Sequence, residues 1–369
     1  MITSNSRIES IQALRGIAAL MVVVFHLMTP AAINGYEVIS KIFSHGYIGV
    51  DIFFIISGFI MVLSTSKIAG GIASGYNFFV KRFFRIWPLY VIATIAWSTL
   101  YYTQGWTAKI IDLQILKSIF FIPKDGVPFY SIGWTLDIEI VFYLIFATSI
   151  IFGKYKWTYL IATAFLIYIT KDAQHQITEG IASTSKLWAQ IVSRIFNPHF
   201  LEFYTGIVIG LAYPKLRLIN KNISISIILI CTSFFLWQYS LEFKAHAGFY
   251  GWGIGCTSLF IAVVIYGEHF KTPKFFVWLG KISYSLYLLH TIVYHALRLT
   301  IDKVFGEGYT SGLGYFSFSL SIIFILSWAS QAYIETRLSN FIKSKYIEYS
   351  YFIFKKITKE NKLPISNVN

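Results

Sequence analysis

Long apolar stretches recur from one end of the chain to the other, and short polar segments separate them. Each stretch holds about 15 to 22 residues, close to the roughly 20 residues that a helix needs to cross a bilayer. This pattern predicts an all-α, polytopic membrane protein with about ten transmembrane helices. A further apolar segment, 110–122, is expected to lie in the membrane interface. The predicted spans cover residues 11–29, 47–64, 86–104, 131–152, 157–170, 199–213, 221–239, 250–266, 278–299 and 313–333.

The composition excludes a soluble globular protein. Hydrophobic residues make up 56% of the 369 residues, aromatic residues 19% and charged residues only 13%. The formal net charge of +14 is interpreted as a topology signal, because lysine and arginine gather at alternate ends of the predicted spans. This bias places both termini in the cytoplasm. Nucleic acid is not an expected partner, since binding it needs a folded basic surface and none is evident.

The chain is expected to form one membrane domain, residues 1–335, and a basic cytoplasmic tail, residues 336–369, that lies on the inner membrane face. No linker rich in Ser, Gly or Pro leads to a soluble module. Arg7 precedes the first apolar run as in a signal peptide, but we expect this run to be retained as a span. Cys231 and Cys256 fall inside predicted spans without His or Cys at metal-ligand spacing, so neither a disulfide nor a metal site is expected.

Two ionisable side chains share one face of the first span. Arg15 and His26 are eleven residues apart, which is close to three helical turns and about 16 Å along the axis. An arginine near the centre of a span costs about 3 kcal/mol on insertion scales, so an ionisable residue there indicates a function. The two groups lie towards opposite leaflets if the helix crosses the bilayer. They are candidates for a site that connects both sides of the membrane, or for polar contacts that hold helices together.

A basic motif, Lys81-Arg82-Phe83-Phe84-Arg85, comes just before the predicted third span. Arg82 and Arg85 are three residues apart and are therefore neighbours on a helix. Two guanidinium forks at that position suit a phosphate or pyrophosphate. Pro88 is expected in the first helical turn, where free N–H groups would add to an anion site. The alternative is that these residues only follow the positive-inside rule.

The fourth span carries two carboxylates, Asp137 and Glu139, after Trp134. Glu139 and Tyr143 are one turn apart and share a helical face, whereas Asp137 points elsewhere. Glu139 is expected at a depth that His26 can match. A carboxylate beside an imidazole holds its tautomer and stabilises the imidazolium, so this pair predicts a general base. A structural Glu–His contact would give the same sequence.

Other polar residues fall inside apolar spans. Asp51 and Gly58 share a face of the second span, and we expect Asp51 to cap the helix and Gly58 to permit close helix packing. Glu202, near the start of the sixth span, is a buried acid without a known partner. The ninth span holds a run of hydroxyl groups that ends in a histidine. These residues could line a polar cavity, or the histidine could be a buried core residue whose hydrogen bonds are satisfied. The residues concerned are Ser283, Tyr287 and His290.

Together these segments resemble the membrane acyltransferase family often called acyltransferase-3. The matching motifs are LRG-x₉-H in the first span, GVDIFFIISGF in the second, RFFR before the third, WTLDIEIVFY in the fourth and SYSLYLLH near the end. They occur in order over most of the chain. The segment FIPKDGVPFYSIGWTLDIEIVFY is most similar to the ExoZ-like branch, which acetylates bacterial exopolysaccharides. The chain resembles the stand-alone form, without the additional extracytoplasmic domain that some members carry.

The resemblance implies transfer of an acyl group, usually acetyl, from cytoplasmic acyl-CoA to a sugar hydroxyl on a membrane-associated glycan in the bacterial inner membrane. Acyl-CoA is then a co-substrate, and no tightly bound cofactor and no metal are implied. The implied partners are a polysaccharide or lipid-linked sugar acceptor, membrane lipid, and either a polysaccharide assembly machinery or a second copy of the chain. The catalytic positions fall on His26 and Glu139, and the donor-binding positions on Arg15, Arg82 and Arg85. The residues expected to line or support the cavity are Asp51, Trp134, Tyr143, Ser283, Tyr287 and His290.

Two other interpretations belong to different functional classes. A secondary transporter or lipid-linked sugar flippase would use the buried charges as a pathway, but it predicts inverted repeats, and none is visible. A non-catalytic partner in polysaccharide assembly would leave Arg15, His26 and Glu139 unexplained. Acyl transfer therefore accounts for more of the buried charges than either alternative.

Overall fold

The computed structural model describes residues 4–28, 41–105, 109–123, 126–170, 174–182, 184–197, 199–306 and 309–358. Within these ranges every regular element is helical, which confirms the predicted all-α fold. The α-helices are α1 (Ser4–Met28), α3 (Gly49–Thr65), α4 (Ile72–Thr103), α5 (Lys109–Ile119), α6 (Trp134–Ile151), α7 (Lys156–Thr170), α8 (Gln174–Ala182), α9 (Lys186–Ile195), α10 (Phe200–Leu216), α11 (Lys221–Leu241), α12 (Ile254–His269), α13 (Lys274–Phe305), α14 (Gly312–Ser330) and α15 (Ser339–Thr358). They are joined by π-helical segments, Phe249–Gly253 and Gln331–Leu338, and by 3₁₀ segments, Gly46–Ile48, Ser131–Gly133 and Gly153–Tyr155.

Eight helical stretches in the described ranges are long and apolar enough to cross a membrane, and each coincides with a predicted span. The other two predicted spans correspond to α7 and α10, which have only 15 and 17 residues. At 1.5 Å per residue, α7 is about 22 Å long, which is less than the roughly 30 Å of a hydrocarbon core. The eight stretches are Glu9–Met28, Lys41–Thr65, Ile72–Thr103, Ser131–Ile151, Lys221–Leu241, Phe249–His269, Lys274–Phe305 and Gly312–Glu348.

Helix α4 begins earlier than the sequence pattern predicts. It begins at Ile72 rather than near residue 86, and it carries the basic motif and Pro88 in its interior. The predicted helix start at Pro88, with free N–H groups for an anion, is therefore wrong. Prolines are tolerated within membrane helices where neighbouring helices support the backbone. Close to Pro88, Tyr284 of α13 donates a hydrogen bond of 2.6 Å to the carbonyl of Ile86, which ties this part of α4 to a neighbouring helix.

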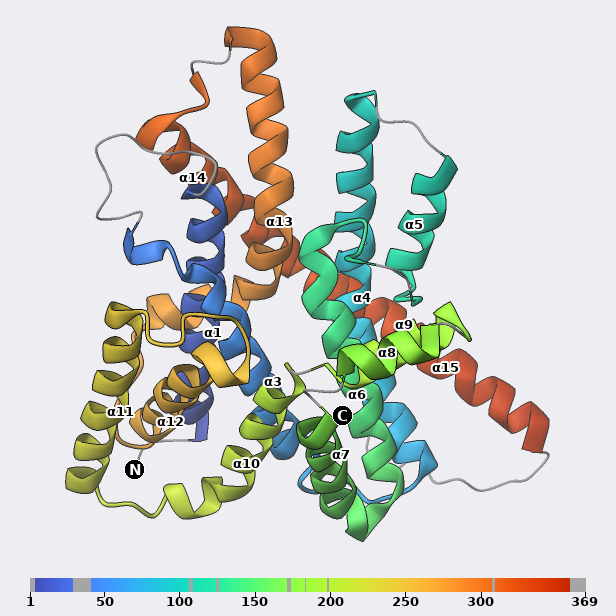
Figure 1. Cartoon of the computed structure of the whole chain (residues 1–369), viewed down its shortest axis with the longest axis vertical. Helices are drawn as coiled ribbons and strands as arrows, with labels where there is room; N and C mark the ends of the chain where they lie inside the picture. Colours follow the sequence, from blue (N-terminus) through green and yellow to red (C-terminus); the bar gives the residue numbers. More distant parts are fainter. Residues whose placement is uncertain are drawn as a thin grey trace.

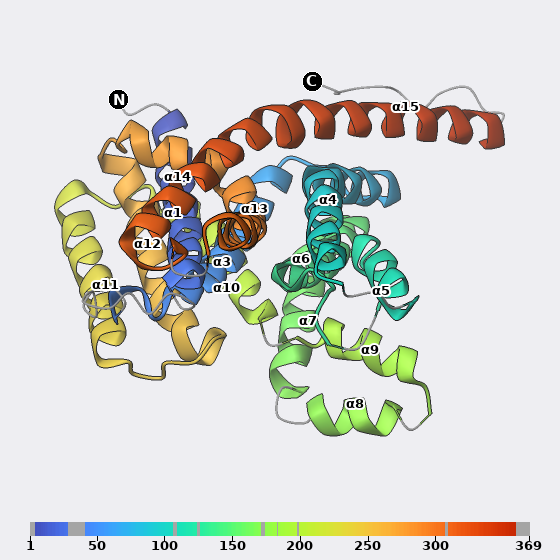
Figure 2. The ribbon, with the colours of Figure 1, turned by 90° about the horizontal axis from the view of Figure 1, so that it is seen from above.

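The helices gather in two groups that meet in the middle of the molecule. Figure 1 shows α4 to α7 on one side, α1 and α11 to α14 on the other, and α3 and α10 between them. The most extensive helix pairs are α1 with α13, α3 with α10, α11 with α12, and α4 with α6. Helices α4 and α13 touch across the centre. The last helix, α15, runs from the end of α14 across α4 and beyond it (Figure 2).

Two glycines let α3 and α10 approach until their backbones touch. A Cβ atom at Gly58 would lie 1.9 Å from the carbonyl oxygen of Phe203, and one at Gly206 would lie 1.9 Å from that of Ile55. No side chain fits at such distances, and small residues at helix interfaces are typical of membrane proteins. The packing role predicted for Gly58 is confirmed, and the contact fixes α3 against α10.

Candidate active site

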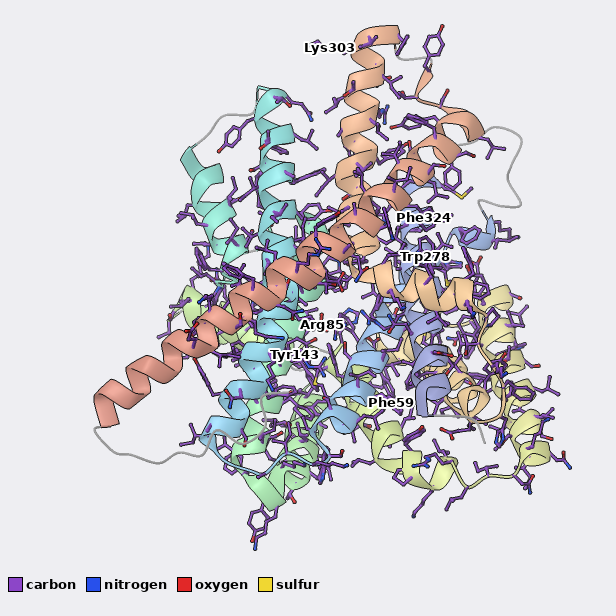
Figure 3. The ribbon with its side chains drawn as sticks, turned by 180° about the vertical axis from the view of Figure 1, so that it is seen from behind. Phe59, Arg85, Tyr143, Trp278, Lys303 and Phe324 are labelled. Carbon is purple, nitrogen blue, oxygen red and sulfur yellow. The ribbon has the colours of Figure 1, made fainter. Side chains whose placement is uncertain are left out.

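One cavity of about 480 Å³ lies where α1, α3, α4, α6 and α13 meet. Its volume falls in the range of small-molecule sites, roughly 300–1,000 Å³. Figure 3 shows two of its lining residues, Arg85 and Tyr143, near one another inside the bundle. The cavity thus collects six of the predicted site residues from four different helices: Arg15, Arg82, Arg85, Glu139, Tyr143 and Tyr287.

The three arginines of the cavity differ in what holds them. The Nη2 atom of Arg82 donates a hydrogen bond of 2.9 Å to Oγ of Ser64, and its guanidinium group lies 5.9 Å from the ring centre of Tyr143. Arg15 and Arg85 make no hydrogen bond to any residue that the structure describes. Their guanidinium forks are therefore available for an anionic ligand.

A second cavity, of about 830 Å³, adjoins the first and shares four lining residues with it, including Arg82 and Arg85. Lys67 and Lys81 also line it. These four cationic residues, which we call the basic mouth, lie near the end of α3 and in the first half of α4. A concave surface lined by one sign of charge concentrates ligands of the opposite sign, so the mouth favours phosphate groups.

Glu139 is held on the cavity wall by two hydroxyl groups. Its Oε1 atom accepts hydrogen bonds from Tyr143 at 2.5 Å and from Ser57 of α3 at 2.9 Å. The predicted pairing of Glu139 with Tyr143 on one helical face is confirmed. Asp137 points elsewhere, as expected, and pairs with Arg194 at 3.1 Å. Ser57 was missed because nothing in the spacing along α3 relates it to α6.

A second carboxylate, Glu335, faces the arginines from the π-helical segment Gln331–Leu338. It interacts electrostatically with Arg85 and Arg15, and its Oε2 atom accepts a hydrogen bond of 3.2 Å from Ser285. Sequence reasoning missed it because it follows the last predicted span at the edge of the predicted tail. π-Helical turns recur at functional sites, but this signal is visible only in the structure.

His26 lies outside the cavity lining and packs against His290 of α13, with the ring centres 5.0 Å apart. The Nδ1 atom of His26 is 2.9 Å from the carbonyl oxygen of Val22, and that of His290 is 2.6 Å from the carbonyl oxygen of Tyr287. A carbonyl oxygen only accepts hydrogen bonds, so each Nδ1 carries the hydrogen and each neutral ring keeps the lone pair on Nε2. We call these two residues the histidine pair.

The predicted contact between His26 and Glu139 is not formed. Glu139 bonds to hydroxyl groups of α3 and α6, whereas His26 packs on α13. Equal depth in a bilayer does not bring two side chains together when their helices pack on different neighbours, and α1 packs mainly on α13. Tyr287 connects the two regions, because it lines the cavity and its ring centre lies 6.1 Å from that of His290.

Four residues expected to line or support the cavity do not line it: Asp51, Trp134, Ser283 and His290, the last of which packs against His26. The capping role predicted for Asp51 is wrong, since it lies in the first turn of α3 and its Oδ1 atom accepts a hydrogen bond of 2.9 Å from the N–H of Gly248. Trp134 packs edge-on against Phe54, which lines the cavity. Ser283 donates a hydrogen bond to a carbonyl of its own helix.

A family model described as an acyltransferase domain, acyltransferase-3, matches residues 8–331. The exopolysaccharide production protein ExoZ of Rhizobium meliloti is 28% identical over 182 residues, which cover 47% of this chain and 53% of that protein. The peptidoglycan O-acetyltransferase OatA of Listeria monocytogenes is 23% identical over 420 residues, covering 95% of this chain and 60% of that protein. A putative O-acetyltransferase of Staphylococcus aureus is 22% identical over 377 residues, covering 89% and 57%.

The chain therefore spans between 53% and 60% of the length of these three relatives. No solved structure matches it. The range matched by the family model contains every residue that lines the cavity and the basic mouth, as well as the histidine pair.

Proposed function

Because the chain belongs to the acyltransferase-3 family, we propose that it is an O-acetyltransferase of the bacterial inner membrane. The donor is acetyl-CoA, and the acceptor is a hydroxyl of a cell-surface or exported polysaccharide or of its lipid-linked precursor. The observation that supports this proposal best is the cavity itself, where three arginines and Glu139 surround one space that adjoins the basic mouth. The names of the ExoZ and OatA relatives support a glycan as acceptor.

The phosphate groups of the donor fit the basic mouth. Arg85 lines both cavities and makes no hydrogen bond to a described residue, so its fork can bind a phosphate in a bidentate manner. The acyl-bearing arm then extends past Arg15 into the first cavity. The bias of lysine and arginine along the sequence assigns the end of α3 to the cytoplasm, which is where acyl-CoA is made available.

The acceptor hydroxyl is a poor nucleophile and needs a base. We assign this role to His26, whose Nε2 keeps its lone pair because Nδ1 faces the carbonyl of Val22. In one route Nε2 takes the hydroxyl proton while the oxygen attacks the thioester carbon. In the other route Nε2 first accepts the acyl group, and the CoA thiolate leaves in both. Glu139 lines the first cavity, into which the acyl-bearing arm extends. We assign to it the role of orienting the acyl end of the donor through the hydroxyl groups of Ser57 and Tyr143, which donate hydrogen bonds to it.

The test is acetyl transfer by the purified full chain in lipid vesicles, supplied with acetyl-CoA labelled in the acetyl group. Release of CoA thiol together with label in added exopolysaccharide or peptidoglycan fragments is the expected result, with protein-free vesicles as control. A transporter or a flippase would leave the thioester intact, so the absence of thiol release would refute the proposal. Inside-out and right-side-out vesicles are compared, and equal donor use from both faces would refute the cytoplasmic donor site.

A further inference from the structure

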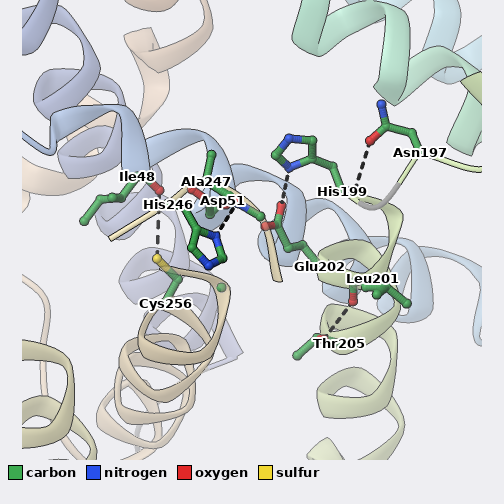
Figure 4. Close-up of polar contacts among 12 residues, drawn as sticks. Ile48, Asp51, Asn197, His199, Leu201, Glu202, Thr205, His246, Ala247 and Cys256 are labelled. Carbon is green, nitrogen blue, oxygen red and sulfur yellow. Dashed lines mark hydrogen bonds and ion pairs between the residues drawn. The ribbon is translucent and has the colours of Figure 1, made fainter. Parts of the chain in front are cut away.

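Three side chains of the kinds that bind metal ions converge at the end of the bundle where α3 and α10 begin. Asp51 lies in the first turn of α3, His199 directly precedes α10, and Glu202 lies in the first turn of α10. One candidate ligand atom from each residue lies within 4.8 Å of the other two. Figure 4 shows this cluster, with the imidazole of His199 directed at Glu202. None of the three residues lines the cavity of the proposed active site.

The carboxylate oxygens of this cluster outnumber the hydrogen-bond donors around them. Asp51 and Glu202 are only 1% and 0% exposed. The Oδ1 atom of Asp51 accepts the N–H of Gly248, but Oε1 of Glu202 is buried without any donor in the described part of the chain. Two buried carboxylates in one site cannot both be ionised unless a counter-charge joins them. No lysine or arginine among the described residues forms an ion pair with either of them, so a proton or a bound cation must supply it.

Asp51 and Glu202 also interact with each other, so one proton held between these two carboxyl groups is the alternative to a cation. The distance between His199 and Glu202 is the observation that fits a cation. The Nδ1 atom of His199 and Oε2 of Glu202 are 3.4 Å apart, which is long for a charge-assisted hydrogen bond. Two ligand atoms at about 2.0–2.1 Å from one tetrahedral zinc ion lie roughly 3.4 Å apart. The observed separation therefore matches two ligands of the same small cation.

The surroundings hold the ligands in place before any ion binds. The ring of His199 packs between Phe54 and Trp134, with ring centres 5.6 and 5.5 Å away. Its backbone N–H donates a hydrogen bond of 2.9 Å to Oδ1 of Asn197. The backbone at Gly253 also lies close to Glu202, since a Cβ atom there would be in ordinary van der Waals contact with Oε1, at 3.4 Å. Such preorganisation is what a metal site needs.

We propose that Asp51, His199 and Glu202 bind one divalent transition-metal cation, of which Zn²⁺ is the best fit. One imidazole and two carboxylates form an N/O donor set typical of zinc, whereas Mg²⁺ and Ca²⁺ take oxygen ligands. The two positive charges balance the two carboxylates. Because the ligands come from the start of α3 and the start of α10, the ion joins these helices at one end of the bundle, while Gly58 and Gly206 join them further along.

The test measures cation binding by the full chain in detergent, purified without a histidine tag and treated with a chelator. We expect about one equivalent of Zn²⁺ per chain by elemental analysis after gel filtration, and a visible Co²⁺ spectrum of a four-coordinate site. Glu202→Gln and Asp51→Asn should bind at least tenfold more weakly. Glu268→Gln is the matched control, because Glu268 is also bonded within the bundle, to Tyr213 on α10, but is no member of the cluster.

Thermal unfolding of the wild-type chain gives a measurement that does not depend on how well the variants fold. A cation that binds only the folded state raises the Tm progressively as its concentration increases. We expect Zn²⁺ to do so for the wild type and the Glu268→Gln control. Failure of Zn²⁺ and Co²⁺ to bind or to raise the wild-type Tm would overturn the proposal and leave a proton shared by the two carboxylates. Binding of Mg²⁺ or Ca²⁺ but not Zn²⁺ would overturn the assignment of the histidine as a ligand.

Discussion

Arg85→Ala is expected to weaken donor binding while leaving the fold intact. Arg85 lines both cavities, is exposed to them, and makes no hydrogen bond to any described residue. Removing it therefore breaks no hydrogen bond among the described residues, and Glu335, which interacts with Arg85, keeps Arg15 and Ser285 as partners. Arg82→Ala differs, because it also removes the hydrogen bond to Ser64 and the cation–π contact with Tyr143. These contribute about 1 kcal/mol and about 0.5–1 kcal/mol, so Arg82→Ala should lower the Tm as well.

The size of the Arg85 effect follows from the bond that it is assigned to make. A hydrogen bond to a charged group contributes about 1.5–3 kcal/mol, and about 1.4 kcal/mol changes an equilibrium constant tenfold. Arg85→Ala should therefore raise the KM for acetyl-CoA by about 10- to 150-fold. The phosphate groups are remote from the thioester, so the loss is one of uniform binding and kcat should change little. Arg85→Lys should restore only part of the affinity, because an ammonium keeps the charge and loses the fork.

The assay is an acetyl-CoA titration at low and high salt for the wild type, each single variant and the double variant that carries both Arg82→Ala and Arg85→Ala. High salt should weaken donor binding in the wild type and matter less in the double variant. Arg217→Ala is the matched control, since Arg217 is exposed, lies over the ring of Tyr213 and lines neither cavity. An unchanged donor KM in the double variant would refute the reasoning, and so would an equal rise in Arg217→Ala.

Three further substitutions test the base, the carboxylate and the packing. His26→Ala should lower kcat by about 10²- to 10⁴-fold because it removes the base. Its circular dichroism spectrum and its Tm should stay close to those of the wild type. Full activity of this variant would contradict the mechanism. Glu139→Gln should lower kcat/KM by less than His26→Ala does, since Gln still accepts the two hydroxyl hydrogen bonds, and a larger loss would show that Glu139 is the base. Gly58→Ala should cost about 1–3 kcal/mol of stability, because its Cβ atom meets a carbonyl of α10. Gly314→Ala is the control, since a Cβ atom there meets nothing within 4 Å. Equal Tm values for these two variants would refute this prediction.

The features that depend on local sequence were predicted well. A membrane span is set by the apolar length of one segment, so eight predicted spans coincide with helices of sufficient length. Helical spacing placed Glu139 beside Tyr143, because residues four apart always share a face. The same locality explains the error at Pro88, since a proline in the first turn and a proline supported within a longer helix give similar patterns.

Contacts between helices could not be predicted in the same way. Depth along the membrane normal suggested that His26 meets Glu139, but packing of α1 on α13 places His290 beside His26 instead. Asp51 and Glu202 are far apart in the sequence, and no spacing rule brings them together. Glu335 follows the last predicted span, where a carboxylate gives no signal until the π-helical segment is seen. Each of these pairings depends on which helix lies alongside which.

The charges around the cavity favour an anionic donor over a neutral ligand at this end of the site. Three arginines line the cavity with Glu139, and Glu335 faces two of them. Among the described residues, three guanidinium groups and two carboxylates leave an excess of one positive charge, and the two lysines of the basic mouth add further positive charge. An unbalanced cation among apolar helices is costly, and phosphate groups would remove that cost where a neutral sugar would not. Under the proposed function, the donor would therefore bind at the mouth and the acceptor beyond Tyr287, beside His26, so we expect the two substrates to approach the reacting group from different sides.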